Sequence, residues 1–209
     1  MDLIWLIPLC LGAYLFGNIN FSILFSRFKK SDIRQKGSGN AGSTNMLRFF
    51  GFKVAITIFI MDIAKGAVAA VVALAIFGFN TSAGTLALFA MGFACVFGHC
   101  FPVLFKFRGG KGMATTLGVF VVAHPIVAPV TFAAGLIFFL IFSNGAGATF
   151  ITITSASIWM LFLNSNYQTV SILILCFYLL ILLTHRTNIR RILLGRENKA
   201  SVFKRQKPK

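Results

Sequence analysis

The stretch GMATTLGVFVVAHPIVAPVTFAAGLIFFLIFSNGAGATFITITSASIWMLFLNSNYQTVSILILCFYLLILLT, residues 112–184, contains no Asp, Glu, Lys or Arg. A helix needs only about 20 apolar residues to cross the hydrocarbon core of a bilayer, so this stretch is long enough to cross it several times. The whole chain of 209 residues is 57% hydrophobic and 11% charged. This composition excludes an ordinary soluble domain and predicts an all-α polytopic membrane protein.

Three further apolar segments precede this stretch, at about 3–26, 54–79 and 82–105. Within the stretch, breaks are predicted at His124-Pro125, Ser143 to Gly147 and Asn164 to Gln168, because Pro lacks a backbone donor and Gly and Asn favour turns. The first of the four resulting segments, 113–123, is short for a span and requires burial by its neighbours. Four crossings give seven transmembrane helices and two give five. We expect seven, with five as the alternative.

Apart from Lys65, which lies inside an expected span, the basic residues gather in three clusters. Lys and Arg total 20 against 4 Asp and Glu, which gives a formal charge of +16. The clusters lie at 27–53, 106–111 and 186–209. Basic loops beside spans mark the cytoplasmic face, so the N-terminus is predicted outside and the C-terminus in the cytoplasm. This distribution argues against nucleic acid as a partner and in favour of a lipid bilayer with anionic head groups.

The chain shows no internal repeat or Pro-rich linker. We therefore predict one transmembrane domain over residues 1–198, followed by a basic cytoplasmic tail over 199–209. The four cysteines lie in apolar surroundings without a CxxC pair, which favours small buried side chains over disulfides or metal ligands.

Three polar islands are expected on the cytoplasmic face: GSGNAGSTNMLR (37–48), GHCFPVLFKFRGGKGMAT (98–115) and HRTNIRRILLGRE (185–197). Glycine lets backbone N–H groups approach an anion closely, and Lys and Arg supply neutralising charge. A helix expected to begin near Asn45 or Met46 would add its positive end. A single island is also compatible with a flexible connector, but the three together predict a site for one or more phosphates.

The chain lacks two established motifs that handle phosphate or acyl groups. A P-loop requires Gly five positions before Gly110 and Ser or Thr after Lys111, where Phe105 and Gly112 stand. None of the 3 histidines is followed by Asp five residues later. The sequence therefore excludes a P-loop and the His-x4-Asp acyltransferase mechanism.

In their order and spacing, the three islands resemble the bacterial membrane acyltransferases that use acyl phosphate to acylate glycerol 3-phosphate. DIR at 32–34 and DIAKG at 62–66 support the resemblance, which extends from about Gly17 to Glu197. The chain departs from the family pattern at Ser43, where Ala is usual, and at Arg108, where Lys is common. The run GNINFS (17–22) also lacks a proline often found there. Arg in place of Lys would alter bidentate phosphate contacts.

The resemblance implies the reaction of acyl phosphate with sn-glycerol 3-phosphate to give 1-acylglycerol 3-phosphate and inorganic phosphate, the first acylation of phospholipid synthesis. It implies a bacterial cytoplasmic (inner) membrane location with the active site on the cytoplasmic face. Acyl phosphate is an activated mixed anhydride, so positioning and charge stabilisation suffice without a metal, a cofactor or a covalent intermediate. No stable protein partner is inferred.

The residues of the islands are assigned as follows. The predicted catalytic residues are His99, Lys111, Arg48, Asn188 and Glu197. The predicted substrate- and phosphate-binding residues are Ser38, Gly39, Asn40, Thr44, Asn45, Gly109, Gly110 and Gly112. His99 is a general base, a hydrogen-bond donor to phosphate or carbonyl, or structural; a substrate phosphate can itself accept the proton. Glu197 either orients a cation or accepts a substrate hydroxyl.

Asp62 and Lys65 share a helix face and are expected to pair within the apolar layer, with direct substrate contact as the alternative. His124 is expected to be a capping or interfacial residue, and His185 either joins the site or marks the membrane edge. An organic-phosphate transporter is the main alternative function, and a structural lipid-binding partner is a second. A transporter predicts charged groups along a route to both faces, whereas the face opposite the islands has almost none.

Overall fold

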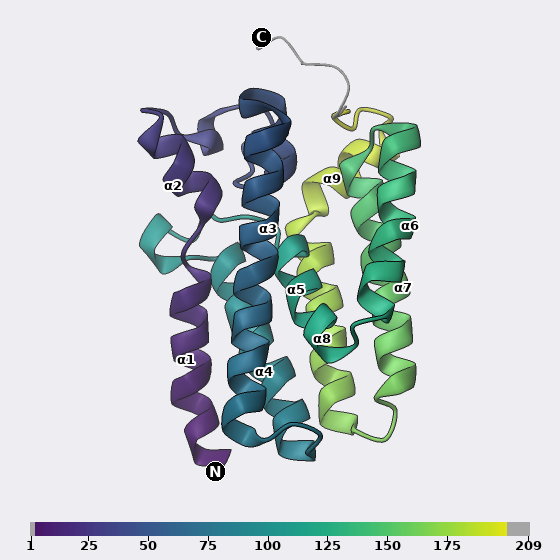
Figure 1. The fold of residues 1–209 in the computed structure, drawn as a ribbon. Coiled ribbons are helices and arrows are strands. Elements are labelled where there is room, and N and C mark those ends of the chain that lie inside the picture. The colour runs from purple at the N-terminus through teal and green to yellow at the C-terminus, as the bar shows by residue number, and fades with distance from the viewer. Residues whose placement is uncertain (1–2, 200–209) are drawn as a thin grey trace.

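A computed structural model describes residues 3–199, and these fold into helices and connections without a strand (Figure 1). The α-helices are α1 Leu6–Gly17, α2 Phe21–Phe28, α3 Ser43–Phe77, α4 Ser82–Cys100, α5 Met113–Ala123, α6 Val127–Phe142, α7 Gly145–Leu163, α8 Gln168–Thr184 and α9 Arg186–Leu193. Short 3-10 helices lie at η1 Leu3–Trp5, η2 Ile33–Gln35 and η3 Val103–Phe105. Apart from Lys199, the basic tail predicted at 199–209 lies outside the described residues.

Four segments of the described chain are long and apolar enough to cross a membrane: Leu3–Phe28, Ser43–Phe77, Ser82–Phe105 and Gly145–Leu163. A fifth results if α8 and α9, which meet at a 59° bend, are counted as one span. The helices α5 and α6 are apolar but shorter. The all-α polytopic class is confirmed, while the count of seven stays a prediction.

The predicted helix breaks agree with the structure. α5 ends at Ala123, before His124-Pro125, and the remaining two breaks separate α6 from α7 and α7 from α8. Earlier in the chain, α3 begins at Ser43, slightly before the helix start expected near Asn45 or Met46. It is kinked at Gly51, whose φ of 81° and ψ of 177° are not helical. The apolar part of α3 after this kink agrees with the span expected at about 54–79.

The first apolar segment consists of two helices. α1 ends at Gly17, and the side chain of Asn20 caps α2 by accepting a hydrogen bond from the Ile23 backbone N–H at 3.1 Å. Asn18 and Asn20 are fully buried. Ser, Asp and Asn compete with helix hydrogen bonding through their own side chains, which accounts for the interruption here.

Small residues bring the central helices close together. A Cβ added at Gly66 of α3 would overlap the Thr115 carbonyl of α5, and one at Gly118 of α5 would overlap the Ile63 carbonyl of α3. Backbones can approach this closely only where one partner lacks a side chain. The core beside them contains an aromatic cluster formed by Phe89, Phe120 and Phe177.

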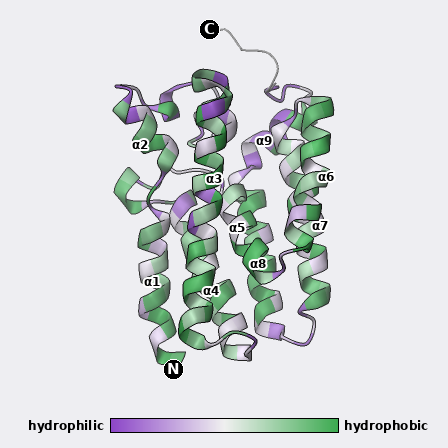
Figure 2. Ribbon diagram, in the orientation of Figure 1, coloured by the Kyte–Doolittle hydropathy of each residue, from purple (hydrophilic) through white to green (hydrophobic). Residues whose placement is uncertain are grey.

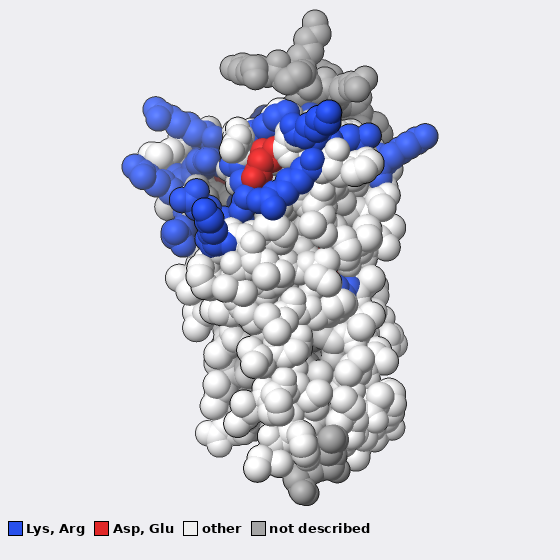
Figure 3. All heavy atoms as spheres, turned by 90° about the vertical axis from the view of Figure 1, so that its left-hand side faces the viewer, with Lys and Arg blue, Asp and Glu red and all other residues white. Residues whose placement is uncertain are grey.

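Polar and charged residues gather at one end of the helix bundle. Figure 2 shows hydrophobic residues along most of the helices and hydrophilic ones near α2, α9 and the upper end of α3. Figure 3 shows Lys and Arg concentrated at that same end on the visible face. This arrangement agrees with a charged membrane surface on one side and hydrocarbon around the rest.

Candidate functional site

A cavity at the polar end brings the three islands together, with walls from the start of α3, the ends of α4 and α8, the loop before α5, the start of α7, and α9 with the segment after it. The predicted site residues that line it are Ser38, Asn40, Thr44, Asn45, Arg48, His99, Lys111, Gly112, Asn188 and Glu197. The predicted residues outside its lining are Gly39, Gly109 and Gly110. Lining residues without a predicted substrate role include Ser43, Phe59, Ala146, Thr149 and Asn198.

Three helices direct their N-terminal ends at this cavity. The cavity lining includes Gly42 and Ser43 at the start of α3, Gly112 at the start of α5 and Gly145 at the start of α7. The N-cap residues of α3 and α5 are Gly42 and Gly112, and neither helix has a side-chain cap. At α7 the Asn144 side chain accepts a hydrogen bond from the Gly147 N–H at 3.0 Å. Unpaired first-turn N–H groups and the helix dipole make uncapped ends such as those of α3 and α5 favourable for anions. The cavity therefore has the polarity of an anion site.

Asn45 organises the loop that precedes α3. Its Oδ1 accepts a hydrogen bond from the Ser38 N–H at 3.2 Å. Its Nδ2 donates to backbone carbonyls of the loop, those of Ile33 (3.3 Å), Lys36 (2.9 Å) and Asn40 (3.1 Å). Both Oδ1 and Nδ2 of Asn45 are thus hydrogen-bonded, and the side chain fixes the conformation of the first island although it also lines the cavity.

Gly109 and Gly110 shape the wall around His99. The Gly109 N–H donates to the Cys100 carbonyl at 3.2 Å, and the Gly110 N–H donates to the His99 carbonyl at 3.0 Å. A Cβ on Gly110 would overlap Nε2 of His99. Gly110 thus allows the loop to pass directly over the imidazole, and the N–H groups of both glycines already donate to backbone carbonyls.

Lys111 lies in a hydrogen-bonded chain that links two islands. Its ammonium donates to Oδ1 of Asn188, whose Nδ2 donates to Oε1 of Glu197 at 2.8 Å. The Thr184 hydroxyl donates to the Lys111 carbonyl at 2.9 Å. Burial lowers the pKa of Lys111 to about 8, although nearby Glu197 acts to raise this pKa.

Arg48 is the second cation of the cavity. Its Nη2 donates to the Asn198 carbonyl at 3.0 Å. Its Nε is buried and has no hydrogen-bond partner among the described residues. A guanidinium with a free donor beside a partly buried ammonium provides charge and geometry suited to phosphate oxygens.

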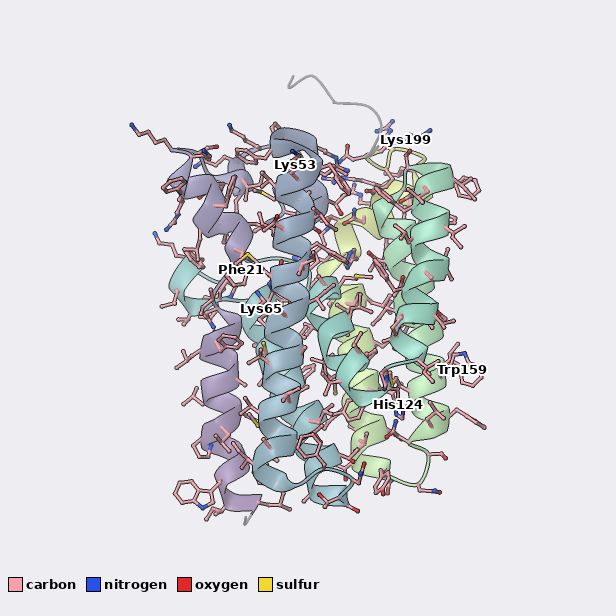
Figure 4. All side chains as sticks on the ribbon, in the orientation of Figure 1. Phe21, Lys53, Lys65, His124, Trp159 and Lys199 are labelled. Carbon is pink, nitrogen blue, oxygen red and sulfur yellow. The ribbon has the colours of Figure 1, made fainter. Side chains whose placement is uncertain are left out.

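Asp62, Lys65 and His99 form a buried cluster at the inner end of the cavity. Oδ1 of Asp62 lies 2.8 Å from Nζ of Lys65, so the expected pair is present. Nζ also lies 2.7 Å from Nδ1 of His99 and donates to the Ile19 carbonyl at 3.0 Å. Figure 4 shows Lys65 beside Phe21, below the polar end of the bundle. Asp62 and His99 both line the cavity, so the cluster connects with it directly.

The cluster defines which nitrogen of His99 carries a proton. An ammonium can only donate, so Nδ1 of His99 accepts from Lys65 and Nε2 bears the proton. His185 has the opposite arrangement. Its Nδ1 lies 2.9 Å from the Ile181 carbonyl, which can only accept, so Nε2 carries the lone pair. The cavity thus contains one imidazole donor and one imidazole acceptor.

The remaining histidine lies elsewhere. Nε2 of His124 is 3.2 Å from Nδ2 of Asn164, at the turn between α5 and α6 and next to the C-terminal end of α7 (Figure 4). His124 is the C-cap residue of α5 and does not line the cavity. The expectation of a capping residue away from the islands is confirmed.

A sequence model of the family described as glycerol-3-phosphate acyltransferase matches residues 7–195. The chain belongs to the glycerol-3-phosphate acyltransferase family. It is similar to glycerol-3-phosphate acyltransferases from Halalkalibacterium halodurans (39% identity, 95% of this chain and 96% of the relative) and Aquifex aeolicus (37%, 91% and 97%). A relative from Mycoplasmopsis pulmonis is 49% identical over 57% of this chain, and this match spans about half (53%) of that relative's length.

Solved structures agree with this family membership. A crystal structure of PlsY (YgiH), an integral membrane glycerol 3-phosphate acyltransferase, in its glycerol 3-phosphate form has a TM-score of 0.85 and 36% identity, and the match covers 93% of this chain and 94% of that chain. The lysophosphatidic acid form of PlsY has a TM-score of 0.83 at 36% identity, with 94% and 96% covered. The resemblance drawn from the three islands is confirmed at the level of the family, and this glycerol-3-phosphate acyltransferase is an integral membrane protein.

Proposed function

We propose that this member of the glycerol-3-phosphate acyltransferase family transfers an acyl group from acyl phosphate to the C1 hydroxyl of sn-glycerol 3-phosphate. The products are 1-acylglycerol 3-phosphate and inorganic phosphate, and the reaction is the first acylation in phospholipid synthesis. The main support is one cavity that combines Arg48, Lys111 and three helix N-termini. Both substrates carry phosphate, so a site rich in cations and N–H donors suits each of them.

The residues act by holding the two substrates and stabilising charge. Arg48 and Lys111 neutralise phosphate oxygens, while the hydroxyls of Ser38 and Thr44 donate further hydrogen bonds. Phe59 and Ala146 give the cavity an apolar side for the first carbons of the acyl chain. The bound C1 hydroxyl is then aligned with the acyl carbonyl, so the two groups react within one complex and no longer have to meet by diffusion.

Transfer forms a bond between the C1 oxygen and the acyl carbon and breaks the bond from that carbon to the phosphate oxygen. The C1 hydroxyl loses a proton, and the leaving phosphate gains one. His99 presents N–H at Nε2, so of its three roles the geometry favours donation to a phosphate or carbonyl oxygen. The proton acceptor is then either Nε2 of His185 or a substrate phosphate.

A transporter for organic phosphates would require polar groups along a path to both faces. In the described chain the cavity is lined by Asp62 and His99 of the buried cluster, and its other lining residues lie toward the polar end of the helices. The family relatives are acyltransferases, which supports transfer over transport.

We further propose seven membrane-spanning helices, with the active site facing the bacterial cytoplasm from the inner membrane. The start of α7 lies beside that of α3, since a Cβ added at Gly145 would stand 3.2 Å from Cγ2 of Thr44. Because α7 begins at the same end of the bundle as α3, we propose that the short α5 crosses away from this end and that α6 crosses back to it. A single cysteine at Asn144, in a cysteine-free background, should resist an impermeant thiol reagent in intact cells. Labelling without permeabilisation would support five spans.

The donor is the part of this proposal that most needs a test. A compact phosphate-binding cavity suits an acyl phosphate, whereas acyl-CoA requires room for its pantetheine and nucleotide. Purified protein should convert radiolabelled glycerol 3-phosphate to 1-acylglycerol 3-phosphate with palmitoyl phosphate, and give little product with palmitoyl-CoA or palmitoyl-acyl carrier protein at equal concentration. Comparable turnover with a thioester would overturn the donor assignment and leave the acyltransferase activity in place.

A further inference from the structure

One carboxylate oxygen in the cavity lacks a hydrogen-bond donor. Oε1 of Glu197 accepts from Nδ2 of Asn188 at 2.8 Å, but Oε2 is buried and has no partner among the described residues. A carboxylate has only acceptors, and a buried acceptor left unpaired is unfavourable. The position therefore calls for a ligand that brings a donor to it.

The surroundings of Glu197 define that ligand more closely. Its charge acts on both Arg48 and Lys111, so the carboxylate shares the cavity with the two cations assigned to phosphate. Nε of Arg48, a donor, is likewise buried and unpaired within the described part of the chain. An unpaired donor and an unpaired acceptor in one cavity fit a molecule with both a phosphate and a hydroxyl.

The position of Glu197 favours one hydroxyl over the other. Glu197 follows α9, two residues before Lys199, which Figure 4 shows at the polar end of the bundle, above the level of Lys65. The C1 hydroxyl must face the acyl carbonyl, whose chain extends toward hydrocarbon and the apolar side of the cavity at Phe59. The C2 hydroxyl is then the one that faces the carboxylate.

We infer that Oε2 of Glu197 accepts a hydrogen bond from the C2 hydroxyl of glycerol 3-phosphate and so determines the acceptor specificity of the enzyme. This inference rests on the proposed function. Dihydroxyacetone phosphate has a carbonyl at C2, so its oxygen and Oε2 of Glu197, both acceptors, would face each other. 3-Hydroxypropyl phosphate has no oxygen at C2 and would leave Oε2 unpaired. A site that hydrogen-bonds a substrate hydroxyl strongly rejects analogues without it.

The test compares the three acceptors in competition, with palmitoyl phosphate as the donor. The wild-type enzyme should prefer glycerol 3-phosphate over each analogue by at least about 100-fold in kcat/KM. In Glu197→Gln the amide oxygen still accepts from Asn188, while the NH2 group takes the place of Oε2. The preference should then fall below about 10-fold, and the ketone should surpass the deoxy analogue because an amide N–H donates to a carbonyl. Ratios from competition do not depend on the fraction of folded enzyme.

Arg196→Gln is the matched control, because Arg196 is the exposed neighbour of Glu197 and does not line the cavity. It should keep the wild-type ratios. Equal use of all three acceptors by the wild-type enzyme would overturn the inference, as would a Glu197→Gln variant that slows all acceptors equally. Absence of any transfer to glycerol 3-phosphate would instead refute the proposed function. Calorimetric binding of the three phosphates to both proteins then decides the role of Glu197, and an unchanged binding preference in the variant rejects it.

Discussion

Lys65→Met removes an ammonium that lies close to three acceptor atoms, two of them in the buried cluster. Nζ lies within 3.0 Å of Oδ1 of Asp62, Nδ1 of His99 and the Ile19 carbonyl, and the lysine is 2% exposed. Breaking a buried ion pair by removing one partner costs about 3–5 kcal/mol. His99 recovers part of this by donating from Nδ1, 3.5 Å from Oδ1 of Asp62, so we expect a loss near the lower end, about 3 kcal/mol.

The loss can be measured by SDS titration of the protein in mixed micelles, with unfolding followed by far-UV circular dichroism. Lys53→Met is the matched control, since Lys53 is an exposed lysine of the same helix, and it should change the free energy of unfolding by less than about 0.5 kcal/mol. The double variant Asp62→Asn/Lys65→Met should be more stable than Lys65→Met alone, because no uncompensated charge is left. A Lys65→Met variant as stable as Lys53→Met would refute this reasoning.

Three further predictions concern the cavity. Arg48→Ala and Lys111→Ala should each lower acyl transfer at least about tenfold with the protein still inserted, since a hydrogen bond to a charged group contributes about 1.5–3 kcal/mol; activity within twofold in both would limit these cations to topology. Gly110→Ala, whose Cβ would overlap His99, should cost about 1–3 kcal/mol of stability in the same titration, against less than about 1 kcal/mol for Gly12→Ala, where the added Cβ meets no atom within 4 Å. Burial lowers the pKa of Lys111 to about 8, so its ammonium form predominates below this pH, and kcat/KM should fall as the pH rises above it. The variant Lys111→Arg should lose this decrease in kcat/KM at alkaline pH. A decrease that is unchanged in the variant would exclude Lys111 as its source.

The sequence predicts the helix breaks well because they depend on local chemistry. Pro125, Asn144 and Asn164 each lie at a break in an apolar run, and their effect on the helix is local and needs no tertiary context. The start of α3 was predicted two or three residues too late, since Ser43 and Thr44 were assigned to the loop, whereas both lie in the first turn of the helix. The number of full spans is harder to predict, because α5 and α6 are apolar but short.

The convergence of the islands was predictable from charge, but the use of each residue was not. Asn45 was assigned to phosphate, and its amide is occupied by the loop, which only the folded backbone reveals. His185 was left open between the site and the membrane edge, and the structure places it in the cavity lining. No sequence feature marked Thr149 as a residue of the site, because it lies in the uncharged stretch and reaches the cavity only through the packing of α7.

The central claim is that the cavity catalyses transfer from acyl phosphate to glycerol 3-phosphate. The most direct measurement is the stoichiometry of the reaction catalysed by purified protein given palmitoyl phosphate and radiolabelled glycerol 3-phosphate. Our account predicts one inorganic phosphate released for each 1-acylglycerol 3-phosphate formed, and little release when glycerol 3-phosphate is omitted. Phosphate release at the same rate without the acceptor, or no acylated product in its presence, would contradict it.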